Sequence, residues 1–356
     1  MNVAHEDVLV RIGSYTGGSH AGRGIITAQV TADGSRIEPL GVTRAEEASY
    51  LATDLSGCLL YAVSETGNGS LVAFRATAGA LEPLNAVSSS GAEPCHLAVA
   101  GGGGFLVAAN YASGSVVVHR LRADGAIGER TCLIQHTGRG PVAGRQDGPH
   151  AHMAAPDPAG DGILLVTDLG ADAVFAYRLD PCAGDLTLAG RTSMPPGSGP
   201  RHLAFHPAEP LVYVLCELDC MLVTCAWDRA TGQLTTLARD PAVTWQGPAM
   251  AACSAIRVSP DGRFLYTACR GPDSITVFGL ARAAAPEVTG VVPSGGASPR
   301  DIALAGNGRL LVCANQESGT ATVFRVDPVT GMPARTGATL TAPAPACIVP
   351  VRPAGS

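Results

Sequence analysis

The sequence predicts an all-β fold: a seven-bladed β-propeller with four antiparallel strands per blade, built by residues 1–356 as one domain. Three observations support this prediction. The 44 glycines and 26 prolines are spread along the chain, as in folds that turn often and contain few long helices. One pattern of short apolar segments and turns recurs six times at a spacing typical of propeller blades. The two ends of the chain supply the pieces of a seventh copy.

Each copy reads as strand, turn, strand, turn, strand, with short β-branched and apolar runs between the turns. The clearest turn is SPDGRF at 259–264, and a further strand-like piece such as DLTLAGRTS lies between copies. Together these pieces predict four strands in each repeat unit. The six copies are residues 48–74, 93–119, 150–177, 199–227, 253–280 and 298–326.

The period of the repeat distinguishes a propeller from a solenoid. Successive polar residues at the predicted end of the second strand are 45, 58, 49, 53 and 45 residues apart, namely Glu65, Asn110, Asp168, Glu217, Arg270 and Asn315. A propeller blade takes about 40–50 residues, whereas ankyrin or leucine-rich repeats are shorter. The spacing therefore favours blades.

The termini are expected to close the ring. Residues 8–19 read as a second strand that ends at Tyr15, and residues 342–351 read as the first strand that this copy lacks. Pairing strands from the two ends removes the exposed edges that an open array would leave. We therefore expect a closing blade shared by the N- and C-terminal strands.

Charge and hydropathy bear on the partners. The formal net charge of −6 and the charged content of 15% indicate no basic surface for nucleic acid and no polybasic patch for a membrane. The N-terminal residues lack the pattern of a signal peptide, and no apolar run is long enough for a membrane span. We expect a cytoplasmic protein, a monomer or weak homo-oligomer, with a small molecule as its partner.

The eleven cysteines are expected to be buried and reduced. Their number is odd, they lie in strand-like runs, and they form no CxxC pairs. Free cysteine commonly behaves as a small hydrophobic residue. The alternative is a redox or zinc role for Cys216, Cys220 and Cys225.

Two sets of side chains should meet at one end of the channel, because the start of strand one and the end of strand two adjoin in an antiparallel pair. The strand-one set, placed 15 or 16 residues before the polar residues above, is Ser49, Cys95, His152, Arg201, Ser254 and Arg300. The three arginines Arg201, Arg270 and Arg300 would suit a small anionic substrate, because guanidinium groups bind carboxylate or phosphate oxygens in pairs. The alternative is that Arg201 pairs with Glu217 and Arg270 with Asp168, which would only tie blades together.

The histidine pair of DGPHAHM, His150 and His152, is not expected to bind a metal. A known metal-binding motif of another fold reads HxHxDH, but this sequence continues HAHMAAPDP. A metal site would have to combine both histidines with Asp168, so we predict no metal and no cofactor. His150 is either a substrate-binding residue or a cap of the strand. By strand alternation, His96 and His202 are expected to face the layer between blades.

Six motifs resemble the seven-bladed-propeller lactonase family over essentially the whole chain: GSYTGG, GPHAHMAAPDP, GPRHLAFHP followed by LCEL, SPDGRFLYTACRG, and SPRDIALAGNGRLLVCANQ. The resemblance implies hydrolysis of 6-phospho-D-glucono-1,5-lactone to 6-phosphogluconate in the pentose phosphate pathway, without a required metal. A related cyclase of the same fold implies a catalytic group at His152, Arg201, Arg270 and Glu217. The chain departs from the usual pattern at Cys216 and Cys269, where an asparagine is common.

We expect His152 or Glu217 to act as the base, and Arg201 with Arg270 to hold the oxyanion and phosphate. The predicted substrate-binding residues are His150, Asn110, Asp168, Arg300 and Asn315. The alternatives are a lactonase or cycloisomerase for another carboxylated lactone, such as a muconolactone-type compound, and a non-catalytic scaffold. The aromatic content of 4% argues against the scaffold. Segment 130–147 is expected to be a lid, with Arg139 and Arg145 attracting the anion.

Overall fold

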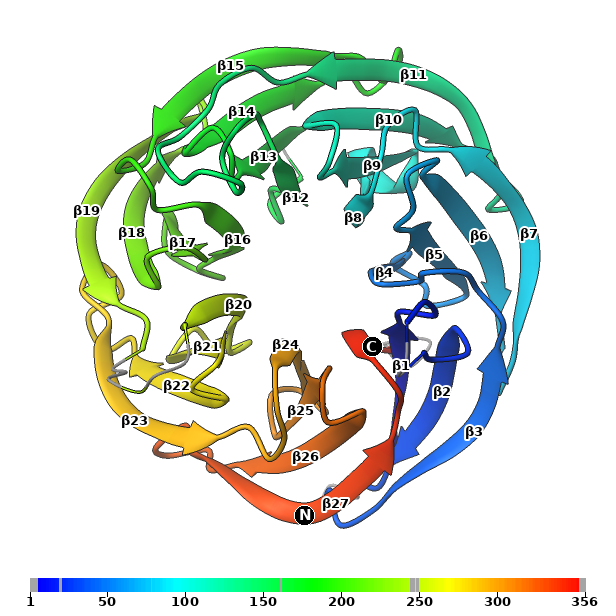
Figure 1. Cartoon of the computed structure of the whole chain (residues 1–356), viewed down its shortest axis with the longest axis vertical. Helices are drawn as coiled ribbons and strands as arrows, with labels where there is room; N and C mark the ends of the chain where they lie inside the picture. Colours follow the sequence, from blue (N-terminus) through cyan, green and yellow to red (C-terminus); the bar gives the residue numbers. More distant parts are fainter. Residues whose placement is uncertain are drawn as a thin grey trace.

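The computed structural model describes residues 6–18, 21–77, 79–160, 162–243, 247 and 250–351. Seven four-stranded antiparallel sheets are arranged as blades around a central channel (Figure 1). This confirms the predicted fold class. In the part of the chain that the structure describes, no helix is long and apolar enough to cross a membrane.

From the channel outwards, blade 1 consists of β28 (Pro345–Pro350), β1 (Val8–Ser14), β2 (Ile25–Val30) and β3 (Ile37–Thr43). Blades 2 to 4 consist of β4 (Leu51–Thr53), β5 (Leu59–Ser64), β6 (Ser70–Ala76) and β7 (Leu81–Ser88); β8 (Pro94–Ala100), β9 (Phe105–Asn110), β10 (Ser115–Leu121) and β11 (Ile127–Gln135); and β12 (Ala151–Pro156), β13 (Ile163–Asp168), β14 (Ala173–Leu179) and β15 (Leu186–Ser193). Blades 5 to 7 consist of β16 (Pro200–Phe205), β17 (Leu211–Cys216), β18 (Met221–Asp228) and β19 (Gln233–Pro241); β20 (Ala252–Val258), β21 (Phe264–Arg270), β22 (Ser274–Gly279) and β23 (Glu287–Pro293); and β24 (Pro299–Ala305), β25 (Leu310–Asn315), β26 (Thr320–Val326) and β27 (Pro333–Thr341).

Blade 1 closes the ring with strands from both ends of the chain. The C-terminal strand β28 pairs antiparallel with β1, with Ile348 opposite Ile12. Both residues are buried. The predicted closing blade is confirmed, and its innermost strand comes from the C-terminus.

The core lies between neighbouring blades. Strands β9, β13, β17 and β25 are buried at every position, because a blade covers each of their faces. Their sequences are accordingly apolar runs, whereas an outer strand such as β7 has one buried residue, Leu81, and is otherwise exposed or half-buried. Between blades 2 and 3, for example, Tyr61 and Val63 belong to one apolar cluster with Leu106 and Ala108.

A β-bulge interrupts the innermost strand near its start in six blades. The register against the second strand shifts there and leaves one extra residue, namely Cys95, His152, Arg201, Ser254, Arg300 or Ala346. A bulge re-aims the side chain that it carries. These are the strand-one positions that the repeat predicts, with Ala346 added by the closing blade.

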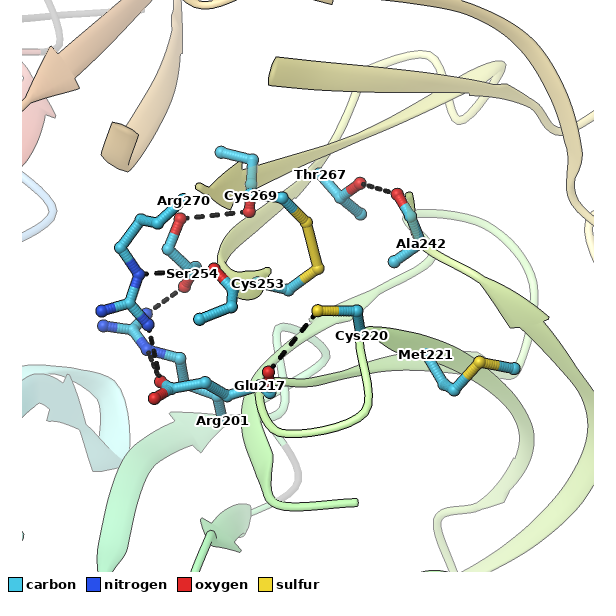
Figure 2. Close-up of a disulfide and its surroundings, with 12 residues drawn as sticks. Arg201, Glu217, Cys220, Met221, Ala242, Cys253, Ser254, Thr267, Cys269 and Arg270 are labelled. Carbon is cyan, nitrogen blue, oxygen red and sulfur yellow. Dashed lines mark hydrogen bonds and ion pairs between the residues drawn. A yellow bond between two sulfur atoms is a disulfide. The ribbon is translucent and has the colours of Figure 1, made fainter. Parts of the chain in front are cut away.

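The prediction that all eleven cysteines are buried and reduced is wrong for one pair, which is oxidised, and for Cys58 and Cys182, which are exposed. Cys253 and Cys269 form a disulfide between the adjacent strands β20 and β21 (Figure 2). The other nine cysteines are free. Cys216 and Cys225 lie in a different apolar cluster from Cys220, so the structure does not bring the proposed redox or zinc trio together.

The segment predicted to be a lid is only partly a loop. Residues up to Gln135 form β11, the outer strand of blade 3, and the loop spans residues 136–150. The glycines and charged residues of this segment concealed the strand, because an outer strand needs only one apolar face.

Candidate active site

Glu217 is surrounded by three guanidinium groups at one end of the channel, and Figure 2 shows two of them converging on it. Its Oε2 lies 2.9 Å from Nε of Arg201 and 3.0 Å from Nη2 of Arg270. Its Oε1 lies 2.5 Å from Nη2 of Arg145. The expected alternative pairing of Arg201 with Glu217 is present, but Arg270 pairs with Glu217 too and not with Asp168. Three cations share one carboxylate, so the arrangement goes beyond one-to-one ties between blades.

Glu217 is ionised despite its burial. Burial alone would raise the pKa of Glu217, but the charges of Arg270 and Arg201 outweigh it and hold the pKa well below the usual range. Burial in turn lowers the pKa of Arg270 to about 10, although Glu217 opposes this shift. A carboxylate that binds protons so weakly is a poor general base.

His152 occupies the bulge of β12 and faces the same region. Its Nδ1 lies 3.9 Å from Sγ of Cys95. The centroid of its ring lies 5.6 Å from that of Tyr111 and 5.4 Å from that of His202. Burial, reinforced by the charge of Arg201, lowers the pKa of His152 well below 6.5. The imidazole is therefore neutral at physiological pH, with a free nitrogen lone pair, and is a weaker base than an ordinary histidine.

A second polar network joins blades 7, 1 and 2. Arg300 donates from Nη2 to the Tyr15 hydroxyl over 2.5 Å, and its guanidinium lies over the Tyr15 ring. The Tyr15 hydroxyl donates to Oε2 of Glu65 over 2.9 Å, and the Ser49 hydroxyl donates to the same oxygen. Burial raises the pKa of Glu65, while Arg300 opposes the shift.

Both networks border one small cavity on the channel axis. Six of the seven blades contribute to it, so its position is set by closure of the ring. Its lining consists of Tyr15, Ser49, Tyr50, Glu65, Cys95, His152, Arg201, His202, Arg300, Asp301 and Ala346. A more open hollow beside it is lined by Tyr15, Gly17, Gly18, Glu47, Arg300, Gln316, Glu317 and Ala344.

The predicted orientation of His96 and His202 is wrong. Ring centroids lie 4.1 Å apart for His96 and Tyr50, and 5.8 Å apart for His96 and His202, although these residues belong to three different blades. They therefore meet in the channel and not between two blades. The bulge before each histidine adds one residue, which breaks the alternation on which the prediction relied. Burial, reinforced by Arg257 and Arg201, lowers the pKa of His96 to about 3.

Three predicted substrate-binding residues lie outside the cavity: Asn110, Asp168 and Asn315 are fully buried. Asn110 donates from Nδ2 to Ser89 O and Ser115 Oγ, and Asn315 donates from Nδ2 to Thr322 Oγ1. Their placement corrects the predicted position at the mouth.

Asp168 is likewise committed to the structure of its own blade. Its Oδ2 lies 2.7 Å from Nδ1 of His136, and its Oδ1 accepts the backbone N–H groups of His150 and Ala171. A metal site built from His150, His152 and Asp168 would have to break these contacts.

The prediction was one residue out in these three blades. The residue that faces the mouth is the next one along the chain. Its backbone N–H donates to the carbonyl oxygen of the residue two positions before the strand-one position. The residues at this place include Tyr15, Glu65, Tyr111, Leu169, Glu217 and Gln316. A shift of one residue turns a side chain to the other face of a strand. The sequence did contain a sign of this error: Asn110 and Asn315 lie 15 residues after their strand-one positions, whereas the corresponding residues of the other blades lie 16 residues after theirs. In blade 4 the hairpin is one residue longer, so Asp168 has the usual offset of 16 and the error could not be seen.

His150 lies at the rim. Its ring stacks on Tyr111 at 4.4 Å, and its Nδ1 lies 2.9 Å from Tyr111 O. It lines a separate hollow beside the 136–150 loop, together with Arg139 and Asp147. Its predicted role in substrate binding stays a prediction.

One cluster of possible metal ligands occurs among the described residues: the sulfur atoms of Cys220, Cys253 and Cys269, which lie within 4.8 Å of one another. The last two are joined as the disulfide. Cys220 also donates to the backbone oxygen of Glu217, and it lies between Glu217 and the disulfide (Figure 2).

Comparison with known proteins agrees with this architecture. Residues 9–350 match the family model described as "Lactonase, 7-bladed beta-propeller". The chain is 33% identical over 344 residues to the 6-phosphogluconolactonase of Bacillus subtilis, covering 95% of this chain and 96% of the relative. It is 32% identical over 294 residues to the 6-phosphogluconolactonase of Formosa agariphila, covering 80% and 82% of the two chains.

A solved structure has the same fold. The periplasmic gluconolactonase PpgL of Pseudomonas aeruginosa superposes with a TM-score of 0.90 at 28% identity, covering 98% of this chain and 99% of that one. The family match excludes the scaffold alternative and confirms that the protein is a hydrolase of lactone esters. The chain belongs to the seven-bladed β-propeller lactonase family.

Proposed function

We propose that the protein hydrolyses 6-phospho-D-glucono-1,5-lactone to 6-phosphogluconate. The observation that carries the proposal is the cluster of Arg145, Arg201 and Arg270 around a single carboxylate, beside the neutral imidazole of His152. Such a site can bind an anionic substrate and stabilise a developing negative charge. The 6-phosphogluconolactonases among the relatives support the same substrate.

In the proposed reaction, His152 takes a proton from water as the water oxygen attacks the lactone carbonyl carbon. Arg201 and Arg270 stabilise the oxyanion that forms on the carbonyl oxygen. The carbon to ring-oxygen bond then breaks, and the ring oxygen receives the proton from His152. Glu217 orients the guanidinium groups and stays ionised throughout.

A second candidate substrate is a lactone that carries a carboxylate in place of the phosphate, such as a muconolactone-type compound. Guanidinium groups bind both kinds of oxyanion, so the cluster around Glu217 is compatible with either. The phosphate ester is favoured by the names of the relatives.

We further propose a cytoplasmic location, a monomeric or weakly associating state, and no nucleic-acid or membrane partner. Nine of the eleven cysteines are free thiols, which suit a reducing compartment, whereas the Cys253–Cys269 disulfide is the kind of bond found in oxidising ones. The net charge of −6 disfavours polyanionic partners.

The test is an assay of 6-phosphogluconolactone hydrolysis with the wild type, Arg201→Ala and Arg270→Ala. Loss of one oxyanion donor is expected to lower kcat by about 100–1,000-fold. The same assay after dialysis against a chelator tests whether a metal is needed, and we expect unchanged turnover. Wild-type turnover no faster than spontaneous ring opening would overturn the proposal.

A further inference from the structure

The 136–150 loop carries an arginine from blade 3 into the site of blade 5. Arg145 reaches Oε1 of Glu217, 72 residues further along the chain. Oε1 takes this guanidinium alone, whereas Oε2 takes both Arg201 and Arg270. Arg145 therefore occupies a separate side of the carboxylate.

The loop holds Arg145 in place through the residue that follows it. Gln146 is fully buried, and its Nε2 donates to Leu169 O over 2.8 Å and to Oδ1 of Asp172 over 2.7 Å. Its Oε1 accepts the N–H of Val142 over 3.2 Å. A loop tied down in this way presents Arg145 at a defined position, which favours binding by reducing the conformational entropy lost.

Arg145 is the most accessible cation of the cluster. Its side chain is 42% exposed, against 21% for Arg270 and 5% for Arg201. Burial lowers its pKa, but Glu217 and a hydrogen bond with Tyr111 outweigh that and raise the pKa further. The group is thus always charged and faces arriving solute.

The charges of the cluster around Glu217 are unbalanced. Three guanidinium groups contribute three positive charges and the carboxylate of Glu217 contributes one negative charge, so the cluster has a net charge of +2. A phosphate monoester carries about −1.5 to −2 at neutral pH. A phosphate placed there would balance the cluster.

We propose that Arg145 forms an outer subsite that binds the phosphate group of the substrate, while Arg201 and Arg270 on the other oxygen of Glu217 are the inner cations. Glu217 holds Arg145 in place before the substrate arrives. The inner cations then remain available for the lactone carbonyl. This inference rests on the proposed function for the identity of the substrate, and it adds the residue that distinguishes a phosphorylated lactone from a neutral one.

Three variants and two substrates test the subsite: Arg145→Ala, Arg145→Lys and the control Arg122→Ala, each with 6-phosphogluconolactone and unphosphorylated glucono-1,5-lactone. Arg122 lies between β10 and β11, is exposed, and forms no ion pair with a residue that the structure describes. Arg145→Ala should lower kcat/KM for the phosphorylated lactone by about 10–100-fold, as expected for loss of a charged hydrogen bond. Its effect on the neutral lactone should be at least tenfold smaller, and lysine should restore part of the loss.

A binding measurement separates this inference from the proposed function. Isothermal titration with inorganic phosphate needs no turnover, and Arg145→Ala should bind phosphate at least tenfold more weakly than the wild type and Arg122→Ala. That result supports the subsite even if the wild type fails to hydrolyse 6-phosphogluconolactone. Equal phosphate affinity in wild type and Arg145→Ala, or equal loss on both lactones, would overturn it.

Discussion

Arg201 and Glu217 form a buried ion pair at the mouth of the channel, with Nε 2.9 Å from Oε2 and each side chain only 5% exposed. Both come from blade 5, one from the bulge of its innermost strand and one from the residue after its second strand. Arg201 also donates to the backbone oxygen of Ser254 in blade 6. The pair therefore serves the charge of the site and the contact between two blades.

Removing the negative charge of this pair should damage both stability and activity. In Glu217→Gln, three guanidinium groups lose their counter-charge, and breaking a buried pair costs about 3–5 kcal/mol. We expect a lower midpoint in urea unfolding and a fall in kcat/KM of about 100-fold or more. The control Glu129→Gln breaks an exposed pair with Arg120 and should change neither by much. Wild-type activity in Glu217→Gln would contradict the role of Glu217 in orienting the arginines.

The pH profile of the reaction should identify the base. Because the pKa of His152 lies well below 6.5, the imidazole stays neutral as the pH falls through 6.5. With unphosphorylated glucono-1,5-lactone, which has no phosphate that titrates near pH 6, we expect kcat/KM to remain level there and to fall only at more acid pH, where His152 becomes protonated. His152→Asn should abolish this acid limb together with most of the activity. A limb centred near 6.5 that persists in His152→Asn would point to another base.

The channel histidines should make the fold acid-sensitive. The pKa values of His96, His152 and His202 are all lowered, so below pH 6.5 the unfolded chain binds protons that the native protein does not. The free energy of unfolding should fall as the pH drops below 6.5, by up to about 1.4 kcal/mol per pH unit for each histidine. Urea unfolding at pH 7.5 and 5.5 measures this. A smaller drop in His96→Phe than in the wild type would support the assignment, and an equal drop would contradict it.

The disulfide should stabilise blade 6 and steady Arg270. Cys253 and Cys269 are bonded directly before Ser254 and Arg270, and the bond closes a loop of 16 residues. A loop of this length is typically worth about 3 kcal/mol. The double variant Cys253→Ser, Cys269→Ser should therefore melt at a lower temperature and have a lower kcat. Thiol labelling of the denatured, unreduced protein should count nine cysteines, and eleven would show that the pair is reduced.

Asp168 should matter for stability and not for catalysis. Its carboxylate is fully buried against His136 and two backbone N–H groups, away from the axial cavity. Asp168→Asn should cost about 1.5–3 kcal/mol through weakened charged hydrogen bonds. The kcat/KM of the folded variant should stay within about threefold of the wild type, whereas a loss confined to KM would restore Asp168 to the binding site.

Much of the molecule was readable from the sequence because the repeat is local. Each blade except the closing one is formed by one continuous segment of the chain. Periodicity alone therefore predicted the number of blades, the closure of the ring and the positions of His152, Arg201 and Arg300. Glu217 and Arg270 followed from the same register. These features depend on neighbours along one or two strands.

The tertiary structure decided what depends on single-residue register or on distant segments. Whether Asn110 or Tyr111 faces the channel turns on one residue, and the bulges that send His96 and His202 inward leave no mark in the apolar pattern. The contact of Arg145 with Glu217 joins residues that no spacing rule connects. Cys253 and Cys269 lie 16 residues apart, which is the offset of the repeat, but the offset alone does not say that the two facing thiols are bonded. The sequence by itself determined the blades and most of the charges at their mouth; only the closed ring determined which of those side chains meet, because that depends on how seven separate sheets pack around one axis.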